Sequence, residues 1–232
     1  MAEAVVLAAS DADVERDADA VFAALRQGRV AILPLDVAYA VIGMKPEAIR
    51  AIFAAKARSY EKPSGMFGSW MLSREVHLMA PEHHEIGRVI VEEYGLPFSI
   101  VAPFRADHPL LRAADPFVLE NSTKAGTLDM LINAGRWHDA IARKSLAAGL
   151  PVFGSSANRS LTGSKYRLED IEPEIRAAAA IAIDGGLAKY ANPEGKSSTI
   201  IDFRDFRLVR RGVVVDKLIA IFKDRFGITL TD

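Results

Sequence analysis

The 232-residue sequence contains no cysteine, which excludes disulfide bonds, thiolate metal sites and a cysteine nucleophile together. It also lacks any apolar run of the roughly 18 residues that a membrane-spanning helix requires, so we expect no membrane association. The first residues, MAEAVVLAASDADVERD, contain no basic segment and soon become acidic, which argues against a signal peptide. These absences predict a cytoplasmic protein.

The sequence has no excess of charge of either sign, with 29 basic and 30 acidic residues and a net charge of −1. Proteins that depend on nucleic-acid phosphates usually carry a basic surplus, so the bulk charge gives such a role no support. The glycine-rich motifs GxxxxGK(S/T) and GxGxxG are absent as well. Any nucleotide site must therefore be assembled from several segments.

The chain is half apolar and a quarter charged, without repeats or a linker, which predicts one domain over residues 1–232 with short extensions at both ends. The apolar periodicity predicts helices at 12–27, 46–58, 83–94, 136–148, 168–179 and 215–226. It predicts strands at 30–35, 38–44, 65–70, 98–103, 127–132, 151–153, 181–184, 197–203 and 207–210. Residues 104–126 are expected to form a long loop with one short strand.

Alternating strands and helices are typical of an α/β protein, here with a single twisted, open, mixed sheet flanked by helices. The runs AILPL, FSIVA, LDMLI and STIID are apolar throughout most of their length, which predicts strands covered on both faces. His83 and His84 are adjacent on a predicted helix, so they point in different directions and make a poor metal pair. We predict no metal site formed by the protein.

Polar residues stand at the ends of these apolar runs, where open α/β sheets usually bind ligands. In LPLDVAYAV (33–41), Asp36 either faces a site with Tyr39 or marks a turn at the end of a strand. In KARSYEKP (56–63), Lys56 and Arg58 can reach one ligand only if the helix ends there. Alternatively, these cations simply complement the negative end of the helix.

Two later segments also place polar residues at the ends of apolar runs. In PVFGSSANRS (151–160), the small residues Ser156, Ala157 and Asn158 would let backbone N–H groups and hydroxyls approach an anion, unless the segment is an ordinary polar turn. Near 195–212, Ser198, Thr199 and Arg210 would come together in a hairpin if the pairing register allows it.

In their order and spacing these segments resemble the YrdC-like family, whose best-known members are threonylcarbamoyl-AMP synthases. That family shows P-T-D/E-T-x-Y-G-L, K-x-R-x-x-x-x-P, G-P-Y/L-T, a v-R-x-P strand, S-A-N-x-S-G, E-S-T-V/I-V/I-D and R-x-G. The corresponding segments here are PLDVAYAV (34–41), KARSYEKP (56–63), LPFSI (96–100), MLIN (130–133), SANRSL (156–161), SSTIID (197–202) and RRG (210–212). The resemblance covers about residues 20–214.

The resemblance implies a YrdC-like fold with a concave, positively lined cavity, and an activity that uses ATP with Mg²⁺, bicarbonate and an amino acid. In the family, a carbamate attacks the α-phosphate of ATP, pyrophosphate leaves, and the adenylate goes on to modify tRNA. No tightly bound cofactor is expected. The positions carried over are Lys56 and Arg58 as catalytic residues, and Lys56, Arg58, Ser156, Ala157, Asn158, Ser198, Thr199 and Arg210 as nucleotide contacts. The expected substrate pocket is Leu35, Asp36, Tyr39, Ser99 and Leu131.

The sequence departs from the family pattern mainly where the family handles the amino acid. Two threonines of the first segment are replaced by Leu35 and Val37, and the arginine of v-R-x-P aligns with Leu131. The other replacements are Ala40, Asn133, Ser155, Leu161 and Ser197. Leucines in place of a hydroxyl and an arginine make the pocket more apolar, which disfavours a zwitterion.

Three hypotheses remain open from the sequence. The protein is a threonylcarbamoyl-AMP synthase with altered contacts, a divergent paralogue that binds ATP or AMP with another acceptor, or a non-catalytic member that binds tRNA or double-stranded RNA. The sequence leaves the oligomeric state unknown.

Overall fold

The computed structural model describes residues 9–232. The helices among these residues are α1 (Asp11–Arg26), α2 (Pro46–Ala55), α3 (Trp70–Val76), α4 (Pro81–Arg88), a π-helical turn η1 (Val89–Glu93), α5 (Pro109–Arg112), α6 (Pro116–Glu120), α7 (Arg136–Ala148), α8 (Pro173–Ala178) and α9 (Val215–Phe226). The strands are β1 (Val30–Leu33), β2 (Ala40–Gly43), β3 (Gly65–Phe67), β4 (Phe98–Pro103), β5 (Thr123–Lys124), β6 (Thr127–Ile132), β7 (Phe153–Ser156), β8 (Ala179–Ala182), β9 (Ile200–Asp202) and β10 (Arg207–Arg210).

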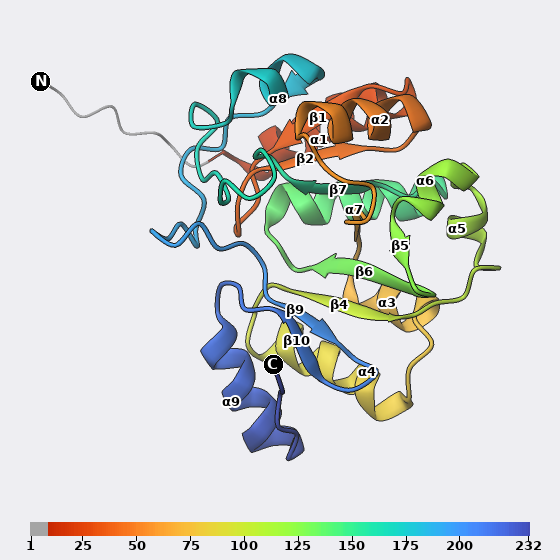
Figure 1. Cartoon of the computed structure of the whole chain (residues 1–232), viewed down its shortest axis with the longest axis vertical. Coiled ribbons are helices and arrows are strands. Elements are labelled where there is room, and N and C mark those ends of the chain that lie inside the picture. The colour runs from red at the N-terminus through yellow and green to blue at the C-terminus, as the bar shows by residue number, and fades with distance from the viewer. Residues whose placement is uncertain (1–8) are drawn as a thin grey trace, which may run out of the picture.

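The ten described strands form one open, mixed sheet, which confirms the predicted fold class. Their order is β10-β9-β4-β6-β3-β7-β2-β1-β8, and β5 pairs with β6 beside this path. The sheet contains parallel pairs such as β4–β9 and β3–β6 as well as antiparallel pairs such as β4–β6 and β2–β7. Figure 1 shows β1 and β2 at one end of the molecule, with β9 and β10 at the other. Strands far apart in the sequence therefore lie side by side at the centre of the sheet.

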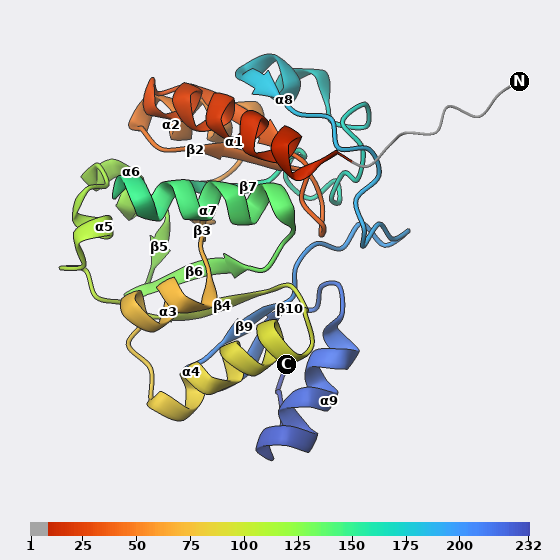
Figure 2. The same ribbon diagram turned by 180° about the vertical axis from the view of Figure 1, so that it is seen from behind.

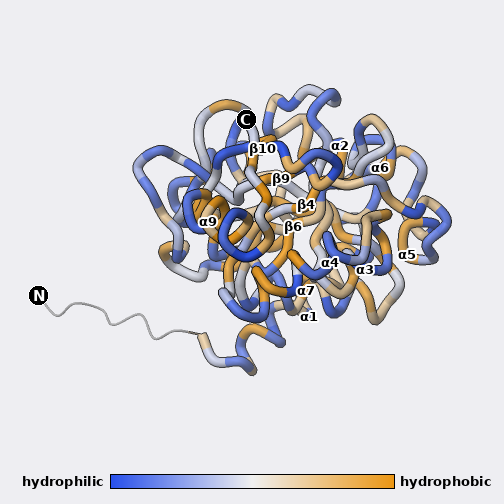
Figure 3. The backbone as a smooth tube through the Cα atoms, turned by 90° about the horizontal axis from the view of Figure 1, so that it is seen from below, coloured by the Kyte–Doolittle hydropathy of each residue, from blue (hydrophilic) through white to orange (hydrophobic). Residues whose placement is uncertain are grey.

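Helices cover the sheet on both faces and enclose two clusters of buried apolar residues. Figure 2 shows α1 and α7 packed side by side; Val21 and Leu25 of α1 and Ile141 of α7 belong to the smaller cluster. The larger cluster lies under α2, α4 and α9 and contains Phe53 and Phe222. In Figure 3 the hydrophobic stretches concentrate along the central strands and the hydrophilic stretches in the outer loops.

Helix α1 begins where its sequence provides a cap. The Ser10 side chain accepts a hydrogen bond from the Asp13 backbone N–H, and the Asp13 carboxylate accepts one from the Ser10 N–H, so two otherwise unpaired donors are satisfied. The same helix is tied to α7 by ion pairs, among them Lys144–Asp19 at 2.6 Å. Both ion-pair partners are accessible to water, so the buried faces of the two helices contribute more stability than the ion pair.

The structure corrects the sequence prediction in two places. Residues 104–126 contain β5, as expected, but also the short helices α5 and α6, which were predicted as loop. Pro109 and Pro116 stand in the first turn of each helix, and His108 and Asp115 cap the two N-termini, so the turn-rich composition reflected helix starts. Helix α3 was also missed, because the predicted strand at 65–70 ends at Phe67 and Trp70 begins this helix instead.

No helix within residues 9–232 is both long and apolar enough to cross a membrane. The prediction that the N-terminus is not a signal peptide rests partly on residues 1–8, which lie outside the described part of the chain.

The aromatic residues that join β4, β9 and α9 provide a test of this packing. Phe203 is buried, and its ring lies 5.6 Å from that of Phe206 and 5.9 Å from that of Phe222. Replacing Phe203 by Ala leaves a cavity, so we expect the free energy of unfolding to fall by about 3–5 kcal/mol. Urea denaturation measures this change, with exposed Leu187→Ala as the control, for which we expect a change below about 0.5 kcal/mol. A loss of less than about 1 kcal/mol for Phe203→Ala would contradict the assigned packing.

Candidate functional site

A cavity of about 910 Å³ opens on one face of the sheet, within the size range of small-molecule sites. Its wall consists of parts of β2, β3, β4, β6, β7, β9 and β10 together with residues 56–63 and 155–164. Because side chains alternate along a strand, Thr127, Asp129 and Leu131 of β6 face the cavity, whereas Leu128 and Met130 pack into the larger core. The expectation that this strand is covered on both faces is therefore wrong.

The lining of the cavity is predominantly basic. Nine lysine and arginine residues line it, compared with three acidic residues, although the whole chain carries a net charge of −1. The basic residues are Lys56, Arg58, Lys62, Lys124, Lys196, Arg204, Arg207, Arg210 and Arg211, and the acidic ones are Glu61, Asp129 and Asp202. Such a concentration of positive charge in a concave site attracts anionic ligands.

Lys56 is the most deeply buried of these cations, at 1% exposure. Helix α2 ends at Ala55, before the predicted residue 58, and Lys56 forms the C-terminal cap, which meets the condition for Lys56 and Arg58 to reach one ligand. The Lys56 ammonium donates to the backbone carbonyls of Ser156 and Asn158, and the Lys56 carbonyl accepts from the Ser160 N–H. Burial, and secondarily the charge of Arg58, lowers the pKa of Lys56 to about 7. Two of the three ammonium donors thus hold the turn after β7, and one remains for a ligand.

Arg58 is oriented by the loop that follows it. Its Nε donates to the Lys62 carbonyl at 2.9 Å and its Nη2 to the Pro63 carbonyl at 2.7 Å. Burial, followed by the charge of Arg210, lowers the pKa of this guanidinium. Its charge therefore has a fixed position in the cavity wall.

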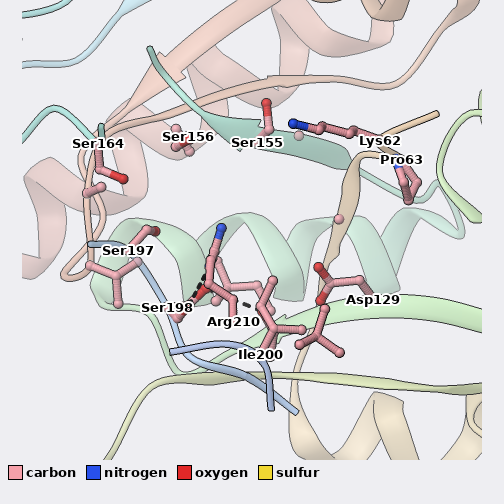
Figure 4. Close-up of a pocket in the computed structure, with 18 of the residues that line it drawn as sticks. Lys62, Pro63, Asp129, Ser155, Ser156, Ser164, Ser197, Ser198, Ile200 and Arg210 are labelled. Atoms are coloured by element: carbon pink, nitrogen blue, oxygen red, sulfur yellow. Dashed lines mark hydrogen bonds between the residues drawn. The ribbon is translucent and has the colours of Figure 1, made fainter. Parts of the chain in front are cut away.

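Arg210 enters the cavity from the opposite side, on β10. Its Nε donates to the Ser198 carbonyl at 2.9 Å and its Nη2 to the Ser198 hydroxyl at 2.8 Å, as Figure 4 shows. The approach depends on Gly212, because a Cβ there would lie 2.2 Å from the Ser197 carbonyl oxygen. The pairing register that would bring Ser198 and Arg210 together is thus present. Arg210 is exposed to solvent at the cavity, and the protein atoms that surround its guanidinium lower the pKa of this group by desolvation.

Strand β7 and the turn after it supply unpartnered polar groups to the cavity. Ser155 Oγ, Asn158 Oδ1 and Ser160 Oγ are each buried and have no hydrogen-bond partner within residues 9–232. Buried polar atoms in native proteins are almost always paired, so these atoms are the natural contacts for a bound molecule or ordered water. Ser156 also lines the cavity, at the end of β7.

Four residues of the predicted substrate pocket line the cavity: Leu35, Tyr39, Ser99 and Leu131. Tyr39 has its hydroxyl directed elsewhere, because it donates to the Gly186 carbonyl at 2.9 Å and accepts from the Gly185 N–H at 3.0 Å. Burial raises the pKa of Tyr39 to about 12. Tyr39 therefore fixes the 184–186 turn, and its ring alone faces the cavity.

Three predicted site residues, Asp36, Ala157 and Thr199, lie outside the cavity lining. Ala157 is fully buried in the larger core, and the Thr199 hydroxyl donates a hydrogen bond to the Val213 carbonyl at 2.7 Å. Asp36 follows β1, where its carboxylate lies 3.8 Å from the Lys189 ammonium and burial raises its pKa. The backbone N–H of Asp36 donates to the Ala134 carbonyl at 2.7 Å, which joins the segment after β1 to the segment after β6.

Several lining residues were not predicted from the sequence, above all Asp129. A signal was present, because Asp129 interrupts the run LDMLI in the way that Asp36 interrupts LPLDVAYAV. Arg204, Arg207 and Lys196 were missed because no motif marks them, and only the folding of β9 and β10 brings them to the cavity.

The lining suits anions and does not itself form a metal site. No group of three or more metal-ligating side chains occurs in the described part of the chain. Asp202, one of the three acidic lining residues, forms an ion pair with Arg204 at 2.6 Å. A divalent ion would therefore enter with its phosphate ligand.

The sequence matches the family model Sua5/YciO/YrdC, described as "Telomere recombination", over residues 23–212. No curated protein matches the sequence.

Several solved structures share the fold. The hypothetical protein smu.1377c from Streptococcus mutans UA159 gives a TM-score of 0.77 at 20% identity, with 91% of this chain and 93% of that chain covered. P. abyssi Sua5 complexed with L-threonine gives a TM-score of 0.70 at 19% identity, with 95% of this chain and 59% of that chain covered. Full-length HypF in its phosphate- and nucleotide-bound form gives a TM-score of 0.58 at 12% identity, with 82% of this chain and 27% of that chain covered. This chain thus spans less than two thirds of Sua5 and a smaller part of HypF.

The lowered pKa of Lys56 predicts that anion binding depends on pH. The ammonium is charged below about pH 7 and loses its proton above it, so the affinity for sulfate, which stays doubly charged, should fall as the pH rises from 6 to 8. The loss of one charge-assisted contact corresponds to about tenfold or more. No described histidine lines the cavity, but Asp129 lines it with a raised pKa, so comparison with a Lys56 variant is needed to assign the change to Lys56.

Isothermal titration calorimetry with sulfate measures this affinity, and Lys56→Met is the comparison. We expect this variant to bind sulfate weakly and equally at both pH values. A wild-type affinity that is the same at pH 6 and pH 8 would refute the assignment.

Proposed function

The chain belongs to the Sua5/YciO/YrdC family, and on that premise we propose that its cavity binds ATP and adenylates a carbamate. The observation that carries the proposal is the meeting of Lys56, Arg58 and Arg210 around one cavity whose wall also offers unpartnered hydroxyls. The similarity to HypF in its phosphate- and nucleotide-bound form supports a nucleotide as one ligand, and the similarity to Sua5 complexed with L-threonine supports an amine as the other.

The proposed reaction has two steps. An acceptor amine and bicarbonate give a carbamate and water. A carbamate oxygen then attacks the α-phosphorus of ATP, the bond from this phosphorus to the bridging oxygen breaks, and pyrophosphate leaves with that electron pair. The adenylate would then pass its carbamoyl group to tRNA.

This chemistry requires no side-chain nucleophile. It requires that two anions be held in line while their charge is neutralised, which is positioning combined with electrostatic stabilisation. Arg58 and Arg210 enter the cavity from opposite sides, so they can contact different phosphates of one nucleotide. Backbone carbonyls and Ser198 hold both guanidinium groups, so little reorganisation accompanies binding. Mg²⁺ would enter as the complex with ATP.

The acceptor is either threonine, as in the synthases, or a different amine. Leu35 is buried and Leu131 half-buried, and both line the cavity beside Ser99. An apolar wall disfavours the carboxylate of a zwitterion. We therefore favour a divergent acceptor over threonine.

An RNA-binding role has less support than nucleotide binding. Several arginines at the cavity are already paired, Arg204 with Asp202 at 2.6 Å and Arg211 with Asp232 at 2.7 Å. These pairs reduce the charge that remains for phosphate contacts.

Pyrophosphate release from ATP, measured with bicarbonate and a panel of primary amines including L-threonine, tests the activity. We expect release that requires both bicarbonate and an amine. Release that is independent of both would point to a simple ATPase, and the absence of ATP binding would refute the proposal.

Arg210→Met tests the assigned phosphate contact. Removing this charge should weaken ATP binding by about 10- to 150-fold, because a hydrogen bond to a charged group contributes about 1.5–3 kcal/mol. The matched control is Arg26→Met, which removes an exposed arginine on α1, away from the cavity. Equal ATP affinity of the Arg210 variant and the wild type, measured by calorimetry, would contradict the contact.

A further inference from the structure

Asp129 is one of three acidic residues in a cavity whose charged lining is predominantly basic. It lies on β6, opposite Val101 of β4, and its side chain faces the cavity on the side of Arg210, as Figure 4 shows. Arg58 and Arg210 both influence its charge, yet neither forms an ion pair with it in residues 9–232. The carboxylate is thus near two cations but forms an ion pair with neither of them.

One carboxylate oxygen of Asp129 lacks a partner. Oδ1 is sealed from solvent and has no hydrogen bond within the described residues. Desolvation raises the pKa of this carboxyl, whereas Arg210, the Ser99 hydroxyl and Arg58 oppose the rise. Leaving a buried polar atom unpaired is unfavourable, so this carboxylate oxygen is a natural contact for a bound ligand.

The space beside the second oxygen is open because Gly65 has no side chain. A Cβ on Gly65 would lie 3.4 Å from Asp129 Oδ2, at ordinary contact distance. Gly65 lines the cavity on β3, next to β6 in the sheet. A donor group of a bound molecule can therefore approach Oδ2 over Gly65.

We propose that Asp129 and the gap above Gly65 form a subsite for the ammonium group of the acceptor, which is a primary amine with a short apolar chain. The inference rests on the proposed function, since it names the acceptor of that reaction. Asp129 is the unpartnered anion of the lining, because Asp202 is paired with Arg204 and Glu61 lies at the exposed rim. Phe67 and Leu131 lie on the same face and would contact the apolar chain.

A metal ion is the competing ligand for a carboxylate. Mg²⁺ prefers several oxygen ligands in octahedral geometry, and the described residues contain no group of three or more metal-ligating side chains. An ammonium group needs only one anion and a few acceptors. Because bound phosphates would neutralise Arg58 and Arg210, amine binding should strengthen once the nucleotide is in place.

The test uses 1-amino-2-propanol as the amine and propane-1,2-diol as its uncharged counterpart, titrated into the full chain with and without α,β-methylene-ATP. We expect the amine to bind, more tightly with the nucleotide present, and the diol to bind at least tenfold more weakly. Asp129→Asn keeps the size of the side chain and removes its charge, so it should weaken amine binding by about tenfold or more. The matched control is Asp170→Asn, at an exposed position outside the cavity lining.

A second variant protects the test against misfolding. Gly65→Ala leaves the Asp129 charge in place but fills the approach to Oδ2, so it should also weaken amine binding. Equal amine affinity in Asp129→Asn and wild type, or equal binding of amine and diol, would overturn the subsite. So would an Asp129→Asn variant that loses Mg²⁺ affinity alone. ATP affinity is read separately, and its absence in the wild type would refute the proposed function instead.

Discussion

The buried ammonium group of Lys56 is the interaction on which the site depends. It joins the end of α2 to the turn after β7 by donating to the carbonyls of Ser156 and Asn158. A lone buried cation would be strongly unfavourable, so those carbonyls must stay in place to solvate it. The turn is thereby fixed with its hydroxyls directed toward the cavity. A ligand anion would complete the solvation of the same cation. Folding and ligand binding therefore both depend on surrounding the Lys56 ammonium with negative or polar groups.

The cavity contains both fixed positive charges and a negative charge within a small space. Arginines held by backbone carbonyls present fixed positive charge, which suits phosphate groups whose charge changes during transfer. Asp129, unpaired between these arginines, presents the opposite charge and suits a cation. Apolar residues such as Phe67 and Leu131 separate the polar groups and limit access of water, which strengthens every charge interaction inside. This combination fits a reaction that joins an amine, a small anion and a nucleotide.

The sheet topology brings these groups together. β4, β6, β3 and β7 are neighbours in the sheet although they are far apart in the sequence, and β9 is parallel to β4. Since alternate residues of a strand face opposite sides, the register decides which of them line the cavity. On β6 it places Asp129 and Leu131 toward the ligand and Met130 into the core. A shift by one residue would remove the only acidic group on that strand from the cavity.

The sequence by itself determined the order of the main helices and strands, the fold class and the family, because apolar periodicity, prolines at helix starts and short motifs are local signals. It also identified Lys56, Arg58, Ser156, Asn158, Ser198 and Arg210, all of which line the cavity. Only the tertiary structure decided that Asp36, Ala157 and Thr199 lie outside the lining and that Asp129 lies within it. The physical reason is that facing a cavity depends on strand register and on neighbours distant in the chain, which a local pattern does not specify.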